Sequence, residues 1–123
     1  MTKAAALYDF FSSFGLAAYE ENTVPDEATF PYLTYPVTTD SFSEYSVPIN
    51  FSLWYRSTSW REINAKCEEI SAHIGISGVL IKCDGGRIWI KRGQPFANSM
   101  GDPNDEQVKR KSINLILDYL TEN

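Results

Sequence analysis

The chain has 123 residues, of which 43% are hydrophobic and 14% aromatic, and its formal net charge is −5. This length is typical of one domain, so we expect a single domain over residues 1–123. The composition excludes both a disordered chain and a coiled coil. No apolar run approaches the roughly 20 residues of a membrane-spanning helix, so no membrane partner is expected.

The first predicted element is a short helix whose apolar side chains recur at helical spacing. Its apolar face consists of Leu7, Phe10, Phe11 and Phe14. Gly15 is a natural terminator because glycine enters the left-handed conformation at little cost. Residues 16–19 are expected to form a first strand, and the acidic residues 20–29 a loop.

Two further strands are predicted before the central helix. Residues 30–38 are rich in aromatic and β-branched side chains, but Pro31 and Pro36 cannot donate to a sheet ladder. This strand is therefore expected either at a sheet edge or interrupted at its ends. In residues 47–56 apolar and polar side chains alternate, with Trp54 on the nominally polar side. That alternation predicts a strand with one face in the core.

The central helix is the strongest helix prediction in the sequence. Ser59 and Glu62 have the spacing of a capping box, in which the two side chains bond each other's backbone amides. Apolar side chains follow at steps of three and four as far as residue 74, and Gly75 ends the pattern. We therefore predict a helix over residues 60–74.

The C-terminal part is predicted to contain a hairpin, a loop and a last strand. Residues 79–83 and 87–91 flank Asp84-Gly85-Gly86, which predicts a hairpin with a primed turn. Residues 93–107 hold two prolines and two glycines and are predicted to be a long polar loop. Residues 113–120 fit a strand or a helix, and we favour a strand, with residues 108–112 as its exposed lead-in.

This order of elements predicts an α+β fold. We expect a mixed, mainly antiparallel sheet, with the N-terminal helix and the central helix packed on one face.

The sequence contains no familiar catalytic or phosphate-binding motif. His73 is the single histidine and has no partner at metal-ligand spacing, while Cys67 lies on an apolar helical stripe and Cys83 precedes Asp84. We therefore expect no catalytic residue, no metal and no cofactor. A small enzyme that uses carboxylates in an aromatic cleft remains a distant alternative.

The charge is unevenly distributed along the chain. The first 50 residues carry seven acids and one base, a net charge of −6, whereas residues 51–123 carry nine acids and ten bases. Six of these bases fall in two strips, Arg87, Lys91 and Arg92, then Lys109, Arg110 and Lys111. Either the strips are ordinary solvated faces, or the protein has an acidic and a basic side suited to head-to-tail association.

The candidate interface for a second copy or a partner combines these bases with nearby aromatic and acidic side chains. Trp54 and Trp89 lie on nominally polar strand faces, so they either pack in a sheet covered on both sides or contact a partner. The acidic residues of the 93–107 loop are expected to be solvated or to become ordered on a partner. The full set is Trp54, Arg87, Trp89, Lys91, Arg92, Asp102, Asp105, Glu106, Lys109, Arg110 and Lys111.

The acidic net charge argues against specific nucleic-acid binding. DNA contact through the two basic strips is a weaker alternative.

Taken in order, these elements resemble the small tail-terminator or tail-completion proteins of long-tailed phages. The likeness rests on the N-terminal helix, on Phe30-Pro31-Tyr32-Leu33-Thr34-Tyr35 and on the long strand before the central helix. It continues through the segment from Arg87 to Phe96 and the closing segment from Val108 to Leu115, so it covers nearly the full chain.

The resemblance implies a structural virion protein without an active site. Such proteins assemble as a ring, typically a hexamer, on the end of the tail tube, where they stop tube polymerisation. The implied partners are other copies of the chain, the major tail tube protein and a head-side neck protein, and DNA can pass through the ring lumen. The implied location is the head–tail junction of the virion, after assembly in the host cytoplasm. Another neck component, such as a head–tail connector or a head-completion protein, is the alternative.

Overall fold

Two helices and six strands make up the computed structural model, which describes residues 1–123. Their bounds are α1 (Lys3–Ser12), β1 (Ala17–Glu20), β2 (Tyr32–Tyr35), β3 (Val47–Arg56), α2 (Arg61–Ile74), β4 (Val79–Cys83), β5 (Gly86–Asp102) and β6 (Asp105–Thr121). The strands form one sheet in the order β1-β2-β3-β6-β5-β4. Only β1 and β2 pair in parallel, so the fold is α+β with a mixed, mainly antiparallel sheet, as predicted.

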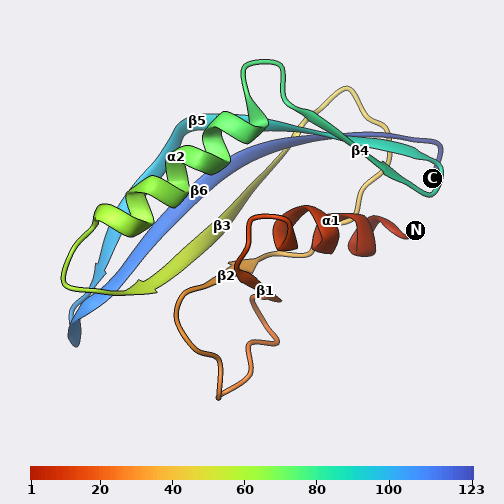
Figure 1. The fold of residues 1–123 in the computed structure, drawn as a ribbon. Coiled ribbons are helices and arrows are strands. Elements are labelled where there is room, and N and C mark those ends of the chain that lie inside the picture. Colours follow the sequence, from red (N-terminus) through yellow and green to blue (C-terminus); the bar gives the residue numbers. More distant parts are fainter.

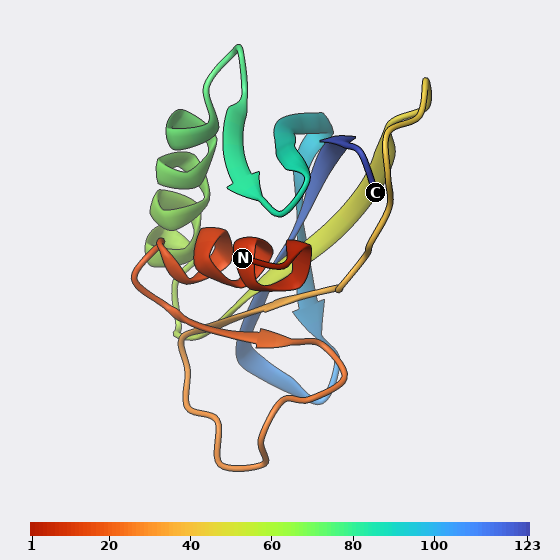
Figure 2. The same ribbon diagram turned by 90° about the vertical axis from the view of Figure 1, so that its right-hand side faces the viewer.

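Both helices cover the same face of the sheet (Figure 2). The core is one cluster in which the apolar side chains of α1 and α2 meet every second residue of the strands. The edge strands β1 and β4 both contact α1, so the sheet curls around that helix. This arrangement leaves the opposite face of the sheet without a covering layer (Figure 1).

Helix α1 begins four residues before the predicted apolar face. The Thr2 hydroxyl accepts a hydrogen bond from the Ala5 amide at 3.1 Å and so caps the helix. Phe11 stacks on Tyr35 with 4.6 Å between ring centroids and also meets Phe51 at 5.0 Å, which anchors the helix to β2 and β3. Neither helix is long and apolar enough to cross a membrane.

The two prolines around β2 interrupt the strand at its ends. Pro31 and Pro36 lie immediately outside Tyr32–Tyr35, whose residues pair with β1 on one side and β3 on the other. The first of our two alternatives, an edge strand, is therefore wrong. The strand is internal, and it is short because neither proline can continue the ladder.

The predicted capping box does not form at the start of α2. The Ser59 hydroxyl accepts a hydrogen bond from the Arg61 amide at 3.0 Å, two residues away, instead of from the amide of Glu62. The Ser59 amide in turn donates to the Ser57 hydroxyl at 3.1 Å, so it is not free for the Glu62 side chain. The helix itself is confirmed, and it ends at Gly75 with a φ of +69°.

The β4–β5 hairpin is confirmed, but its turn is not primed. Cys83 pairs with Gly86, which leaves Asp84 and Gly85 as the two turn residues. Only Gly85 of the two has a positive φ, of +84°. Primed turns need a positive φ at the first turn residue, and here that residue is Asp84.

The prediction of a long loop over residues 93–107 is wrong. The segment is the second half of β5 and the start of β6, joined by a tight turn at Pro103 and Asn104. The favoured strand at residues 113–120 is confirmed. The prediction of an exposed lead-in at residues 108–112 is wrong, because these residues belong to the same strand and Val108 and Lys109 are buried.

A bulge in β5 explains why the sequence resembled a loop there. Arg92 pairs with Leu115 and Ala97 pairs with Ile113, so four residues of β5 face Asn114 alone. The Asn114 side chain donates to the carbonyl of Pro95 at 2.8 Å and holds the bulge in place. Because a bulge leaves residues unpaired, it tolerates a proline that has no amide to donate.

Candidate interaction face

Side chains from five strands form a row across the uncovered face of the sheet. We call these residues the aromatic–arginine row: Tyr19, Tyr32, Trp54, Arg110 and Met100. The register places Tyr32 opposite Trp54, Trp54 opposite Arg110, and Arg110 opposite Met100. The row therefore runs perpendicular to the strands, and directly opposed side chains lie on one face.

The aromatic rings of the row contact one another in sequence. The ring centroids of Tyr19 and Tyr32 are 5.9 Å apart, and those of Tyr32 and Trp54 are 6.2 Å apart in a stacked arrangement. The Arg110 guanidinium lies over the Trp54 ring, 4.7 Å from its centroid. Cation–π contact of this kind attracts the guanidinium to the ring face.

Two hydroxyl groups beneath the row fix its orientation. The Trp54 indole donates to Thr34 Oγ1 at 2.9 Å, and the Arg110 Nε donates to Ser52 Oγ at 3.1 Å. Thr34 and Ser52 are buried although no helix covers them, because the indole and the guanidinium lie above them. Burial, together with the neighbouring Tyr19, raises the pKa of the Tyr32 phenol.

A shallow pocket of about 270 Å³ lies at the end of the row. Its lining residues are Trp54, Met100, Gly101, Asp102, Pro103, Val108 and Arg110. The structure thus brings three predicted interface residues together here, namely Trp54, Arg110 and Asp102. Tryptophan and arginine are typical of the energetic centre of a protein interface, and polar residues are typical of the rim around it.

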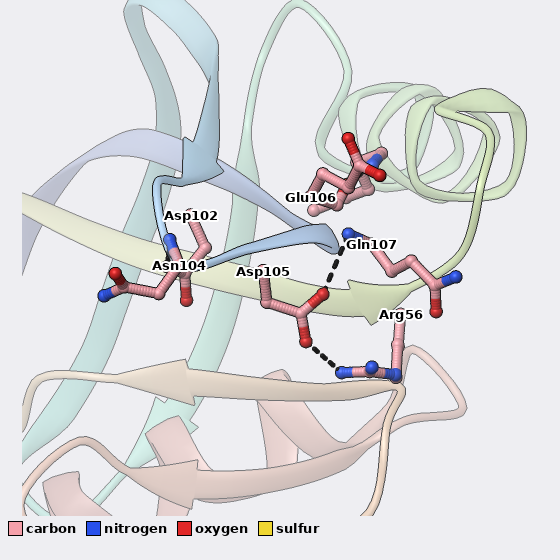
Figure 3. A network of polar contacts seen from close by, with 7 residues as sticks. Arg56, Asp102, Asn104, Asp105, Glu106 and Gln107 are labelled. Carbon is pink, nitrogen blue, oxygen red and sulfur yellow. Dashed lines mark hydrogen bonds and ion pairs between the residues drawn. The ribbon is translucent and has the colours of Figure 1, made fainter.

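The predicted acidic residues of the supposed loop surround the β5–β6 turn. Asp102 accepts a hydrogen bond from the Asn104 amide at 2.8 Å, which stabilises the turn. Asp105 accepts one from the Gln107 amide at 3.0 Å and forms an ion pair with Arg56 (Figure 3). The hydrogen bond from the Gln107 amide has the largest effect on the Asp105 carboxyl and lowers its pKa, and the hydrogen bond from the Arg56 side chain lowers it further. Glu106 is exposed beside them.

The basic strip at residues 109–111 is divided between the two faces of the sheet. Arg110 lies on the uncovered face, whereas Lys109 and Lys111 lie on the helix-covered face, within 5.6 and 6.0 Å of the Trp60 ring centroid. The Lys111 ammonium also donates to Ser99 Oγ at 2.7 Å. Since neighbouring residues of a strand point to opposite faces, three consecutive bases cannot form one patch.

The first basic strip is divided in the same way. Arg87, Trp89 and Lys91 lie on the uncovered face, and the Lys91 ammonium is 4.4 Å from the Trp89 ring centroid and 2.6 Å from Asp118. Arg92 points to the other face and donates to the hydroxyl of Ser71 in α2 at 3.0 Å. The Ser46 hydroxyl also donates to Asp118, at 2.6 Å. The hydrogen bonds from Lys91 and from Ser46 lower the pKa of the Asp118 carboxyl.

The two predicted tryptophans belong to separate clusters. Arg110 and Asp118, which mark the two clusters on β6, are eight residues apart and therefore about 26 Å apart along the strand. Hydrogen-bonded asparagines and a serine fill the space between them, with Asn50 donating to Asn114 at 2.9 Å and to Ser112 at 2.6 Å.

Sequence reasoning missed the tyrosines and the methionine of the row. Tyr19, Tyr32 and Met100 are aromatic or apolar residues on strands, and nothing in their local sequence separates them from core residues. The only signal that identifies them is strand pairing, which brings Tyr32 beside Trp54 and Met100 beside Arg110. Pairing of β1 with β2 brings Tyr19 to Tyr32.

The single histidine and the cysteine of α2 contact other side chains of the fold. His73 lies against the rings of Phe10 and Phe14, at 6.4 and 5.5 Å between centroids. Burial raises the pKa of the Cys67 thiol, with a smaller opposing effect of Lys111. No group of three histidine, cysteine or carboxylate side chains is arranged to hold a metal ion.

No protein-family model matches this chain, and searches of curated proteins and of solved structures find no significant match.

Proposed function

We propose that this protein is a structural component of a phage tail. In this proposal it acts as a tail terminator, a ring of identical subunits that sits on the end of the tail tube, stops tube polymerisation and provides the surface joined to the head-side neck. The role is architectural and needs no catalysis or cofactor. It places the protein at the head–tail junction after assembly in the host cytoplasm.

The observation that carries the proposal is the aromatic–arginine row on the uncovered face. Trp54 and Arg110 are preordered by hydrogen bonds to Thr34 and Ser52, so little conformational entropy is lost when a partner covers them. Tryptophan, tyrosine and arginine dominate the binding energy of protein interfaces. A subunit that meets several neighbours needs such a surface in addition to its own core.

The whole-chain resemblance to tail terminators supports the choice among assembly roles. The resemblance implies an α+β fold, and this protein has one. A different neck component, such as a head–tail connector, would use the same kind of surface. Gene order separates the two, because a terminator gene is expected immediately before the gene for the major tail protein.

Electron microscopy with tail tubes tests the proposal. The protein is mixed with tubes of the tail protein encoded beside it, and the mass of the free protein is measured in parallel. We expect an extra ring of density on one end of the tubes. A protein that remains monomeric with tubes present, and leaves the tube ends bare, would refute the proposal.

A further inference from the structure

The uncovered face ends at strand β4 in a surface that is both basic and apolar. We call this surface the basic corner and define it as Leu80, Lys82, Arg87, Trp89, Lys91 and Leu120. Leu80 pairs with Trp89, Lys82 with Arg87, and Arg87 with Leu120, so these side chains are neighbours on one face. Leu80 on β4 and Leu120 on β6 flank β5 and are 53% and 41% exposed, so the corner presents apolar side chains to the solvent.

Two cations of the basic corner have no partner within the chain. Lys91 is paired with Asp118 at 2.6 Å, but Lys82 and Arg87 make no ion pair and no side-chain hydrogen bond. They face each other across β4 and β5, where like charges repel. The nearby carboxylate of Asp84 is already bonded to the N-terminal amino group at 2.6 Å. A carboxylate from outside the chain would relieve this repulsion.

The complementary surface is the segment from Glu20 to Glu27, which we call the acidic loop. It contains four exposed acids and no base: Glu20, Glu21, Asp26 and Glu27. None of these carboxylates forms an ion pair or a hydrogen bond within the chain. Backbone hydrogen bonds from Glu21 to Tyr35 and from Ala28 to Pro25, at 2.9 and 3.0 Å, hold the loop in shape.

The acidic loop and the basic corner lie at opposite ends of the sheet. The loop begins at Glu20, the last residue of the edge strand β1, and the corner includes Leu80 and Lys82 of the other edge strand, β4. Figures 1 and 2 both show the loop projecting from the body, well away from the β4–β5 turn. The two surfaces therefore cannot meet within one copy, but they can meet between two copies.

We infer that the acidic loop of one copy docks on the basic corner of the next. This inference rests on the proposed ring and specifies the contact that closes it. The two patches are different, so the contact is head-to-tail, which is the type of interface that generates rings. Glu21, Asp26 and Glu27 face Lys82 and Arg87 of the neighbouring copy, while Leu80 and Leu120 supply apolar contact area.

Charge reversal on each side tests this contact. The loop variant carries Glu21→Lys, Asp26→Lys and Glu27→Lys, and the corner variant carries Lys82→Glu and Arg87→Glu. Each variant alone brings like charges together, so we expect its self-association, measured by sedimentation velocity with and without tail tubes, to weaken at least about tenfold. An equimolar mixture of the two variants restores opposite charges at every contact, so it should associate as the wild type does.

The mixture also separates a lost interface from a lost fold, because two misfolded variants cannot rescue each other. The control variant carries Arg61→Glu and Glu68→Lys on the exposed side of α2, and it should associate normally. Normal association of either variant alone, or a mixture as weak as its components, would overturn the inference. If the wild type still forms rings on tubes in that case, the proposed function stands without this contact. If the wild type remains monomeric with tubes present, both fail.

Discussion

Trp54 is the central residue of the aromatic–arginine row. Its ring stacks on Tyr32 and supports the Arg110 guanidinium, and its indole nitrogen bonds to Thr34. The alternation of residues 47–56 predicted that Trp54 would point away from Phe51 and Leu53, and the structure places it on the uncovered side of β3. Its neighbours in the row come from other strands.

Trp54→Ala should weaken association with tubes or with further copies while the subunit remains folded. Removal of the central aromatic residue of an interface typically costs about 2 kcal/mol or more, which is about 30-fold in affinity. Circular dichroism checks the fold and co-sedimentation measures binding. Tyr45→Ala is the matched control, because Tyr45 is 75% exposed outside the strands and should bind as the wild type does. Equal binding by the Trp54 variant would exclude the row from the interface.

Tyr119 is a core residue with a polar end. Its side chain is 3% exposed, and its hydroxyl donates to the carbonyl of Thr38. Burial, with smaller contributions from Asp40 and Cys83, raises the pKa of Tyr119 from 10.0 to about 12. The folded protein therefore keeps this phenol protonated at a pH where the unfolded chain releases the proton.

This difference makes stability depend on pH at the alkaline end. Between pH 10 and pH 12 the folded state binds more protons at Tyr119 than the unfolded state, so the free energy of unfolding falls as pH rises. Tyr119→Phe removes this contribution along with the hydrogen bond to Thr38. The stability advantage of the wild type over the variant should therefore be constant below pH 10 and shrink above it, by at most about 1.4 kcal/mol per pH unit. Urea titrations at several pH values measure it, and a constant advantage across that range would contradict the expected pKa.

At the scale of elements, strand β5 is the largest difference between expectation and structure. Glycine and proline mark both loops and bulges, so the sequence of residues 93–107 alone could not decide between them. Pairing with β6 decides it, since β6 is long enough to hold β5 on both sides of the bulge. Phe96 within the bulge packs against the core, which gives this segment an apolar anchor that a free loop lacks.

The bulge requires a glycine at position 93. A Cβ atom added there would lie 2.8 Å from both the Cβ and the carbonyl oxygen of Asn114. Because that oxygen is backbone, the two strands would have to separate. Gly93→Ala should therefore lower the free energy of unfolding by about 1–3 kcal/mol.

Gly101→Ala is the matched control on the same strand. Nothing lies within 4 Å of a Cβ added at Gly101, and its φ is not positive, so stability should change by less than about 0.5 kcal/mol. Thermal or urea unfolding of both variants measures the contrast. Equal stability of the two variants would mean that β5 does not approach β6 as closely as described.

Elements with a strong local signal were predictable, and their connections were less so. The periodic apolar face of α2 and the alternation in β3 predicted both elements because each pattern is complete within its own segment. The prediction of a capping box was wrong because the Ser59 hydroxyl accepts its hydrogen bond from the Arg61 amide. Which amide it bonds depends on the backbone conformation of the residues that precede the helix. Parallel pairing of β1 with β2, and hence the place of Tyr19 in the row, depends on contacts between segments.

At the scale of the whole molecule, the structure changes the meaning of the split charge. The bases that are concentrated in the sequence are spread over both faces, with Arg110 on one side and Lys109 and Lys111 on the other. Unpaired charges of opposite sign instead lie on two surfaces, the acidic loop and the basic corner, at opposite edges of the sheet. The sequence contains both groups, but only the strand order separates them in space.

The length distribution of tail tubes is the most direct test of the proposed role. Tube protein is polymerised with increasing amounts of this protein, and tube lengths are measured by electron microscopy. A terminator binds the growing end, so the mean length should fall as the ratio of this protein to tube protein rises, with a ring on one end of each tube. The Trp54→Ala variant should have a smaller effect at the same ratio. Tubes of unchanged length at every ratio, with no ring at their ends, would contradict the role as a terminator.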